Sequence, residues 1–334
     1  MSCLYVVEQG SKILFDNNQF VVEQVDGSKK FLPGEILESI MIFGNVHMTI
    51  AVFQRCLSKG IRVSFLSSKG HYFGRLESTS FTNPMRIKKQ VYLSDSDKQT
   101  LLFSKLILKS KIHNQEVILR RYSRNSHYDC SKYLRDMKIY ENKIDIAKSI
   151  QEMMGYEGIA ARSYFEALSN MVEDEFKFKG RTKRPPKDAF NSMLSLGYTI
   201  LFYEIYAELE NRGIDPYISF THRIKERHPA LVSDLLEEWR AVLVDATVMS
   251  LVQGHEISIE EFYCDESEGG VLISDRGLKI LIRKIEKKMR STINYLEYLD
   301  SPISFRRCIW WQVKTLAKCI DEEDLSLYQP LKIR

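Results

Sequence analysis

The sequence predicts an α+β protein in which a small N-terminal β-sheet domain is followed by a larger all-helical domain. Two observations support this prediction. Up to about Glu77, short apolar runs alternate with turn signals such as Asp26-Gly27, a pattern typical of strands. Between Met85 and Met154 the chain has neither glycine nor proline, the residues that most often interrupt helices. With 334 residues, the chain is long enough for two such domains.

The domain boundaries follow from these changes in residue pattern along the chain. We place the N-terminal β domain at 1–80, a linker at 81–95 and the helical domain at 96–334. One helix is expected inside the β domain, with Thr49 as its N-cap and Gly60 as the glycine that ends it.

Further helices are expected in the second domain. A long helix should begin near Leu101, and another should begin after Asp188 as N-cap and stop by Gly213. A basic, amphipathic helix is expected around 278–298.

Composition excludes several classes of protein. Hydrophobic residues make up 44% of the chain and charged residues 28%, which is typical of soluble globular proteins. The N-terminus lacks a signal-peptide pattern, and no apolar run approaches the roughly 18 residues of a membrane span, so we expect a cytoplasmic protein without membrane contact. The six cysteines lie far apart, which argues against a zinc ribbon and a disulfide framework.

Glu157 is the most unusual residue of the helical domain. At helical period it shares a core-facing stripe with Ala160, Tyr164 and Leu168. A buried carboxylate persists only if it is paired, hydrogen-bonded or bound to a metal. Glu157 is therefore either paired with Arg162 or a distant Arg or Lys, or it is a metal ligand.

Three further polar residues are candidates for the same site. Asp234 and Glu237 are spaced i, i+3 and share a helix face, and His222 precedes that helix. A carboxylate set suits Mg²⁺ or Mn²⁺, and such a cation assists phosphodiester chemistry by offsetting charge in the transition state. The spacings have no metal-site signature of their own, so a loop histidine and a solvated helix edge remain alternatives.

At these residues the sequence resembles the Cas-one family of CRISPR-associated integrases, which insert new spacers into CRISPR arrays. The first matching motif is Gly-Tyr-Glu-Gly-Ile-Ala-Ala-Arg-Ser-Tyr-Phe at 155–165. The other matching segments are 42–46, 63–66, 185–191, 196–198, 215–218 with His222, 231–240, 304–307 and 328–330. The resemblance covers the whole chain, and the order and spacing of the motifs are specific.

The resemblance implies that Glu157, His222 and Glu237 hold Mg²⁺ or Mn²⁺, with Asp234 as an accompanying acid. It implies an endonuclease and integrase activity in which a DNA 3′-hydroxyl attacks a phosphodiester of the CRISPR repeat. The chain departs from the family at two positions near the site. Ser219 stands where glycine is usual, and Ala241 stands where proline is frequent.

A basic segment at 176–187 acquires a role from this resemblance. Its cations are interleaved with Phe176 and Phe178, a mixture that suits phosphate contact and stacking on an unpaired base. The expected DNA-contacting residues are Arg162, Tyr164, Lys177, Lys179, Arg181, Lys183, Arg184 and Lys187. A second basic track is expected along Lys105, Lys109, Lys111, Arg120, Arg121 and Arg124. The alternative for both tracks is a solvated helix or loop face.

By resemblance, the partners are spacer DNA, the CRISPR repeat, a second copy of the chain paired through the β domains, and the Cas-two protein. Two other functions remain open from the residues themselves. One is a metal nuclease acting on branched DNA, and the other is a catalytically silent DNA-binding scaffold.

Overall fold

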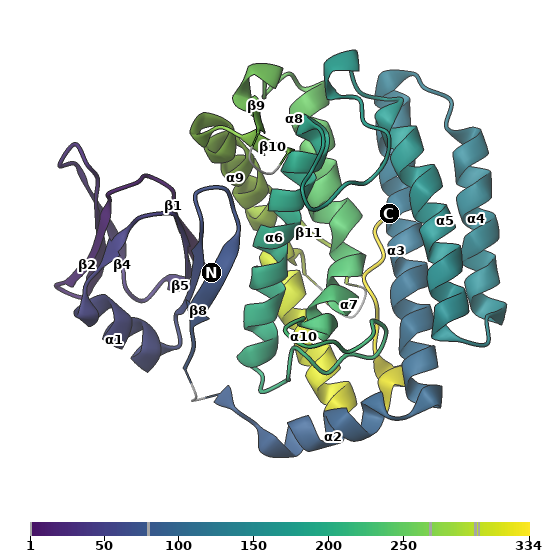
Figure 1. The fold of residues 1–334 in the computed structure, drawn as a ribbon. Helices are drawn as coiled ribbons and strands as arrows, with labels where there is room; N and C mark the ends of the chain where they lie inside the picture. The colour runs from purple at the N-terminus through teal and green to yellow at the C-terminus, as the bar shows by residue number, and fades with distance from the viewer. Residues whose placement is uncertain (1, 79–80, 267–268, 297–298, 300) are drawn as a thin grey trace. The chain divides into compact units, whose positions relative to one another are not determined.

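The computed structural model describes residues 2–78, 81–266, 269–296, 299 and 301–334. The chain divides into two compact units, Met1–Thr82 and Asn83–Arg334, whose elements are labelled in Figure 1. The first unit is built mainly from strands and the second mainly from helices, so the predicted α+β class is confirmed. No helix in the described part of the chain is long and apolar enough to cross a bilayer.

The described residues of the first unit form two four-stranded sheets, ordered β1-β5-β7-β8 and β4-β3-β2-β6. The strands are β1 (Ser2–Val6), β2 (Lys12–Asp16), β3 (Gln19–Glu23), β4 (Lys29–Pro33), β5 (Leu37–Phe43), β6 (His47–Met48), β7 (Arg62–Leu66) and β8 (Tyr72–Leu76). Strands β1, β5 and β7 run parallel, whereas β2, β3 and β4 form an antiparallel meander.

Helix α1 (Ile50–Lys59) completes the core of this unit. Its buried Val52 joins Ile13, Ile40 and Val63 in one apolar cluster. The helix follows Thr49 and ends at Gly60, whose φ of 66° lies in the left-handed region that glycine adopts without strain. The predicted helix and its two boundaries are confirmed.

The described residues of the second unit are mostly helical. The helices are α2 (Pro84–Ser94), α3 (Asp97–Ser126), α4 (Ser131–Ile146), α5 (Ile150–Ser169), α6 (Ala189–Glu210), α7 (Ala230–Trp239), α8 (Ala246–Gln253), α9 (Asp275–Arg290) and α10 (Phe305–Asp321). Two small hairpins pair β9 (Phe262–Asp265) with β10 (Gly270–Ile273) and β11 (Thr292–Ile293) with β12 (Ile303–Ser304).

Two boundaries differ from the sequence-based expectation. Most of the linker expected at 81–95 is helix α2, because the Asn83 side chain caps the helix and Arg86 pairs with Asp321 of the same unit. The helix expected around 278–298 ends at Arg290, and residues 297–298 lie outside the described part of the chain.

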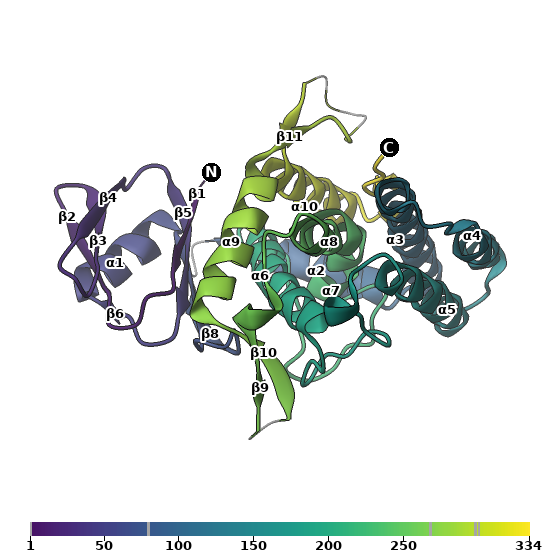
Figure 2. The ribbon, with the colours of Figure 1, turned by 90° about the horizontal axis from the view of Figure 1, so that it is seen from above.

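Helices α7 and α8 form one continuous rod, joined by a π-helical turn over Arg240–Asp245. Seen from above, both helices lie between α6 and α3 (Figure 2). Nearly every side chain of this rod is buried, because α3, α6 and α9 pack around it. Its sequence is accordingly apolar on all sides, apart from a few polar residues that include Asp234 and Glu237. These polar residues mark the candidate site.

Candidate metal centre

The candidate site lies where α3 packs against both α5 and α7. Glu157 comes from the middle of α5, and Glu237 comes from α7. Their exposed fractions are 8% and 6%, so Glu157 is buried, as its core-facing stripe predicts, and Glu237 does not lie on a solvated helix edge. His222 belongs to the loop before α7 and is partly buried.

Lys111 of α3 lies between the two acids. Its Nζ is 2.5 Å from Oε1 of Glu157 and 2.5 Å from Oε2 of Glu237. Burial alone would lower the pKa of Lys111, but the charges of the two carboxylates raise it above its usual value. Glu157 is therefore paired with a distant lysine, one of the alternatives left open by the sequence, and Arg162 is not its partner.

Asp234 fixes the loop that carries His222. It has no exposed surface, and its carboxylate accepts hydrogen bonds from the backbone N–H groups of Phe220, Thr221 and His222 at 2.9–3.0 Å. Its Oδ1 also lies 2.8 Å from His222 Nδ1. The Ser219 hydroxyl donates to the His222 carbonyl, so the residue that replaces the family's glycine closes this loop.

The second nitrogen of His222 points toward Glu237. Nε2 of His222 is 3.9 Å from Oε1 of Glu237, while Nε of Arg240 is 3.1 Å from Oε2. Burial favours the protonated form of Glu237, but the charges of Arg240, Lys111 and His222 lower its pKa to about 2. For His222, burial would lower the pKa, but the hydrogen bond and charge of Asp234 raise it.

The side chains of Glu157, Glu237 and His222 are of the types that bind Mg²⁺ or Mn²⁺. In this structure they belong to an ion-pair network. Two carboxylates and an imidazole are ligands that these cations accept. Within the described ranges, no group of three or more His, Cys, Asp or Glu side chains is close enough to hold a metal. The ammonium of Lys111 lies between the two acids, where a shared cation would otherwise bind. Both oxygens of Asp234 already accept hydrogen bonds from N–H groups, so in this arrangement Asp234 is not a candidate metal ligand.

A second buried network lies beside the acids. Asp245 ends the π-helical turn and accepts hydrogen bonds from the hydroxyls of Tyr164, at 3.0 Å, and Tyr198. The guanidinium of Arg240 lies 4.7 Å from the Tyr198 ring centre, and that of Arg181 lies 5.2 Å from it. Tyr164 has no exposed surface, so the prediction that it contacts DNA is wrong for this structure.

The basic segment is anchored by its aromatic residues. Phe176 and Phe178 are buried, and the Phe178 ring stacks on Phe190 at 4.4 Å between centres. They are therefore not placed to stack on a base, and this part of the prediction is wrong. The Arg181 side chain donates to Asn191 and Ser195. The remaining cations of the segment are exposed: Lys177, Lys179, Lys183, Arg184 and Lys187.

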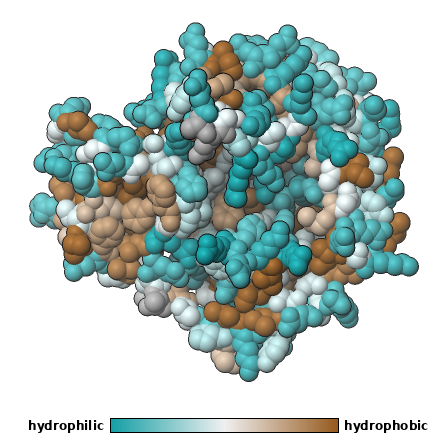
Figure 3. All heavy atoms as spheres, viewed as in Figure 1, coloured by the Kyte–Doolittle hydropathy of each residue, from teal (hydrophilic) through white to brown (hydrophobic). Residues whose placement is uncertain are grey.

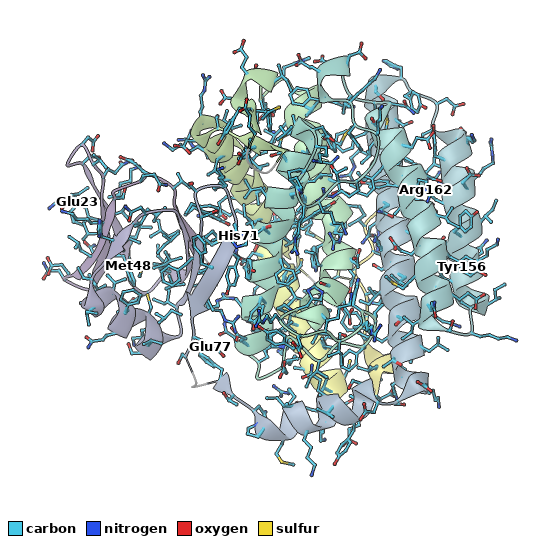
Figure 4. The ribbon with its side chains drawn as sticks, in the orientation of Figure 1. Glu23, Met48, His71, Glu77, Tyr156 and Arg162 are labelled. Carbon is cyan, nitrogen blue, oxygen red and sulfur yellow. The ribbon has the colours of Figure 1, made fainter. Side chains whose placement is uncertain are left out.

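The other predicted cations are distributed more widely. Arg162 is exposed on α5, where Figure 4 labels it. In the second expected track, Lys105 donates to the Asp145 carbonyl and Lys109 pairs with the Asp145 carboxylate at 2.7 Å. Because Lys111 is buried at the acids, these residues do not form one continuous exposed track.

Comparison with known proteins places the chain in a family. A family model described as CRISPR associated protein Cas1 matches residues 4–287, most of the chain. The chain belongs to the Cas1 family. The resemblance expected from the motifs is confirmed.

Relatives and solved structures of Cas1 agree with this assignment. The CRISPR-associated endonuclease Cas1 of Mycobacterium tuberculosis is 31% identical over 318 residues, which are 95% of this chain and 94% of that protein. A casposase bound to integration product has the same fold, with a TM-score of 0.85, 19% identity and coverage of 98% and 94% of the two chains. A Cas6-RT-Cas1–Cas2 complex matches with a TM-score of 0.83 and 24% identity, over 100% of this chain and 36% of that chain.

Four polar residues of this Cas1 site were not assigned to it from the sequence: Lys111, Tyr198, Arg240 and Asp245. A signal for Lys111 was present, since it shares a buried stripe of α3 with Ile107, Asn114 and Ile118. The helical period that places Glu157 on a core-facing stripe also places Lys111 on one. Asp245 had no comparable signal, because its position depends on the π-helical turn.

Proposed function

We propose that this Cas1 protein is a metal-dependent DNA integrase that inserts new spacer DNA into a CRISPR array. The observation that carries the proposal is the convergence of Glu157, Glu237 and His222 from three separate segments. Its relatives are named as endonucleases, which supports phosphodiester chemistry at this site. The fold similarity to a casposase bound to integration product supports strand joining.

Glu157, Glu237 and His222 would hold Mg²⁺ or Mn²⁺. When bound, the cation supplies positive charge beside the reacting phosphate and lowers the pKa of the attacking hydroxyl. Asp234 accepts from Nδ1 of His222, which directs Nε2 toward the carboxylate of Glu237. Asp234 thus acts as a positioning residue.

In the proposed reaction, the 3′-hydroxyl of a spacer end attacks a phosphodiester of the repeat. A new P–O bond forms as the bond to the leaving 3′-oxygen breaks, and the proton of the attacking hydroxyl ends on the leaving oxygen. The exchange requires no covalent protein–DNA intermediate. The exposed cations of the segment 177–187 would hold DNA phosphates beside the acids. Desolvation and the charge of Arg240 lower the pKa of Lys183, and Glu237 is among its other electrostatic partners.

The proposed partners are spacer DNA, the CRISPR repeat, a second copy of the chain and the Cas2 protein. The Cas2 assignment is supported by the complex of a structural neighbour with Cas2. A dimer paired through the first units would place two sites in one assembly, as integration at both ends of a spacer requires.

Strand transfer in vitro tests this function. Purified protein, Cas2, Mn²⁺ and a short duplex with free 3′ ends would be mixed with a supercoiled plasmid that bears the repeat. Wild-type protein should join the duplex at the repeat boundary, and alanine at any two of Glu157, His222 and Glu237 should abolish joining. Cleavage without joining would instead favour a nuclease acting on branched DNA. DNA binding without either reaction would favour a silent scaffold.

A further inference from the structure

Lys111 occupies the position between the two acidic ligands of the proposed site. Its ammonium makes short contacts to one carboxylate oxygen of Glu157 and one of Glu237, each at 2.5 Å. The three residues come from three helices, so their convergence is a product of the fold and not of local spacing. The exposed fraction of Lys111 is 8%, so its side chain is buried in the core of the second unit.

Two buried carboxylates this close would repel each other without a cation. The ammonium of Lys111 offsets that repulsion, because it contacts both carboxylates at once. Arg240 contributes a second positive charge, and its Nε forms an ion pair with Glu237 at 3.1 Å. Lys111 is therefore the cation that the two acids share.

A lysine can also leave such a position. Its charge is a compact ammonium at the end of a flexible four-carbon stem, whereas an arginine would present a rigid planar group. A divalent ion held by the same two carboxylates would be repelled by an ammonium bound to the same oxygens. The ammonium and the metal therefore cannot share the pair at short distance.

We propose that Lys111 is an internal counter-ion that competes with the divalent metal for Glu157 and Glu237 and so sets the affinity of the site. This inference rests on the proposed function, because it takes the two acids to be metal ligands. It implies a linkage with DNA: a phosphate that draws the ammonium away from the acids strengthens metal binding, and bound metal strengthens DNA binding by the same factor.

Mn²⁺ binding to the full-length protein tests the competition. Calorimetry and Mn²⁺ electron paramagnetic resonance would compare wild type with Lys111→Met, which keeps a long apolar stem and removes the charge. The Met variant should bind Mn²⁺ more tightly by at least about tenfold, because the competing charge is gone. Lys109→Met is the matched control, since Lys109 lies on the same helix and pairs with Asp145 at 2.7 Å. Its Mn²⁺ affinity should equal that of wild type.

Thermal unfolding gives a second readout that does not depend on activity. Without metal, Lys111→Met should melt below wild type, and Mn²⁺ should raise its melting temperature by more than it raises that of wild type. Lys111→Gln, which retains an amide donor, replaces the Met variant if that variant does not fold.

Equal or weaker Mn²⁺ binding by both Lys111 variants would overturn the competition. If wild type still bound Mn²⁺ in that case, and Glu157→Gln did not, the proposed metal site would stand. Absence of Mn²⁺ binding by wild type and by both Lys111 variants would overturn the competition and the proposed function together.

Discussion

Asp234 shows how one buried residue organises the candidate site. Its two oxygens accept from three consecutive backbone N–H groups and face the Nδ1 of His222. A buried carboxylate with this many donors is satisfied without a metal. The carboxylate therefore sets both the path of the loop and the direction of the imidazole.

Replacing Asp234 with alanine should destabilise the fold and lower activity together. The change leaves three N–H groups without an acceptor, two of them buried, and removes the partner of His222. The expected cost is about 3–5 kcal/mol in free energy of unfolding. Urea unfolding measures this loss. Asp145→Ala, which removes an exposed pair with Lys109, should change stability by less than about 0.5 kcal/mol. A loss for Asp234→Ala no larger than that of the control would contradict the assignment.

Sequence reasoning was effective at this scale where a polar residue interrupts an apolar stripe. The burial of Glu157 and its need for a partner followed from helical period alone. Lys111 shows the same interruption, but it was interpreted as part of a basic track, because a lysine is usually solvated. The role of Asp234 was not predictable in detail, since the N–H groups it accepts from belong to a loop whose path no periodicity describes.

At the scale of elements, the π-helical turn between α7 and α8 packs against α6 at Gly197. A Cβ at Gly197 would lie 2.6 Å from Cγ1 of Val244, closer than real Cβ contacts allow. Val244 is β-branched and lies in a helical turn, so its side chain has little freedom to move. The absence of a side chain at 197 therefore permits the two helices to pack at this distance.

Gly197→Ala should destabilise the second unit by about 1–3 kcal/mol, the usual cost of overpacking a core. Gly158→Ala is the matched control, because it is also a helix-interior glycine but has no atom within 4 Å of its Cβ position. The control should gain about 0.5–1 kcal/mol from the higher helix propensity of alanine. Denaturant midpoints of the two variants measure the contrast. Equal effects of the two substitutions would contradict this packing.

The contact between α3 and α4 makes stability depend on pH. Glu116 of α3 is 6% exposed, and among the described residues its Oε1 has no hydrogen-bond partner. Burial and the nearby carboxylate of Glu141 raise the pKa of Glu116 above the usual value of 4.5. The folded state therefore holds this proton to higher pH than the unfolded state, and stability falls as pH rises from about 4.5 through the raised pKa.

Glu116→Gln should remove that pH dependence. Near pH 7 the variant should be more stable than wild type by about 1 kcal/mol, and below about pH 4 the difference should vanish. Urea unfolding of both proteins at the two pH values checks this. A difference that stayed constant, or one that favoured wild type near pH 7, would contradict the assignment.

Element boundaries were predictable where the sequence carries explicit caps and breakers. Asp188 caps α6 and accepts from the Asn191 N–H, as its position before an apolar stripe indicated. Phe176 and Phe178 were misinterpreted because a loop rich in cations suggests an exposed segment. Tertiary packing against Phe190 decided their burial, and local sequence does not report such packing.

At the scale of the whole molecule, the first unit carries several large apolar side chains on its surface. Apolar side chains are visible over this unit in the space-filling view (Figure 3). Its exposed large apolar residues include Val25, Phe31, Ile36, Ile50 and Phe73. Exposed apolar residues gathered on one small unit are typical of a protein interface.

We expect the protein to be a dimer in solution, paired through these first units. Light scattering across micromolar concentrations should give twice the chain mass of 39.0 kDa. Phe73→Glu should shift the protein toward monomer, because it places a charge on the exposed apolar surface. Only monomer for wild type across this range would contradict the dimer.

The most direct test of the central claim is the rate of strand transfer with a single carboxylate changed to its amide. Glu157→Gln preserves the shape of the side chain and removes its charge. Glu152→Gln is the control, since Glu152 lies on the same helix and is exposed. With Mn²⁺, Cas2 and a repeat-bearing plasmid, Glu157→Gln should slow joining by at least about a hundredfold, while its DNA binding is retained and the control matches wild type. Joining by Glu157→Gln at the wild-type rate would contradict a metal-dependent integrase centred on this acid.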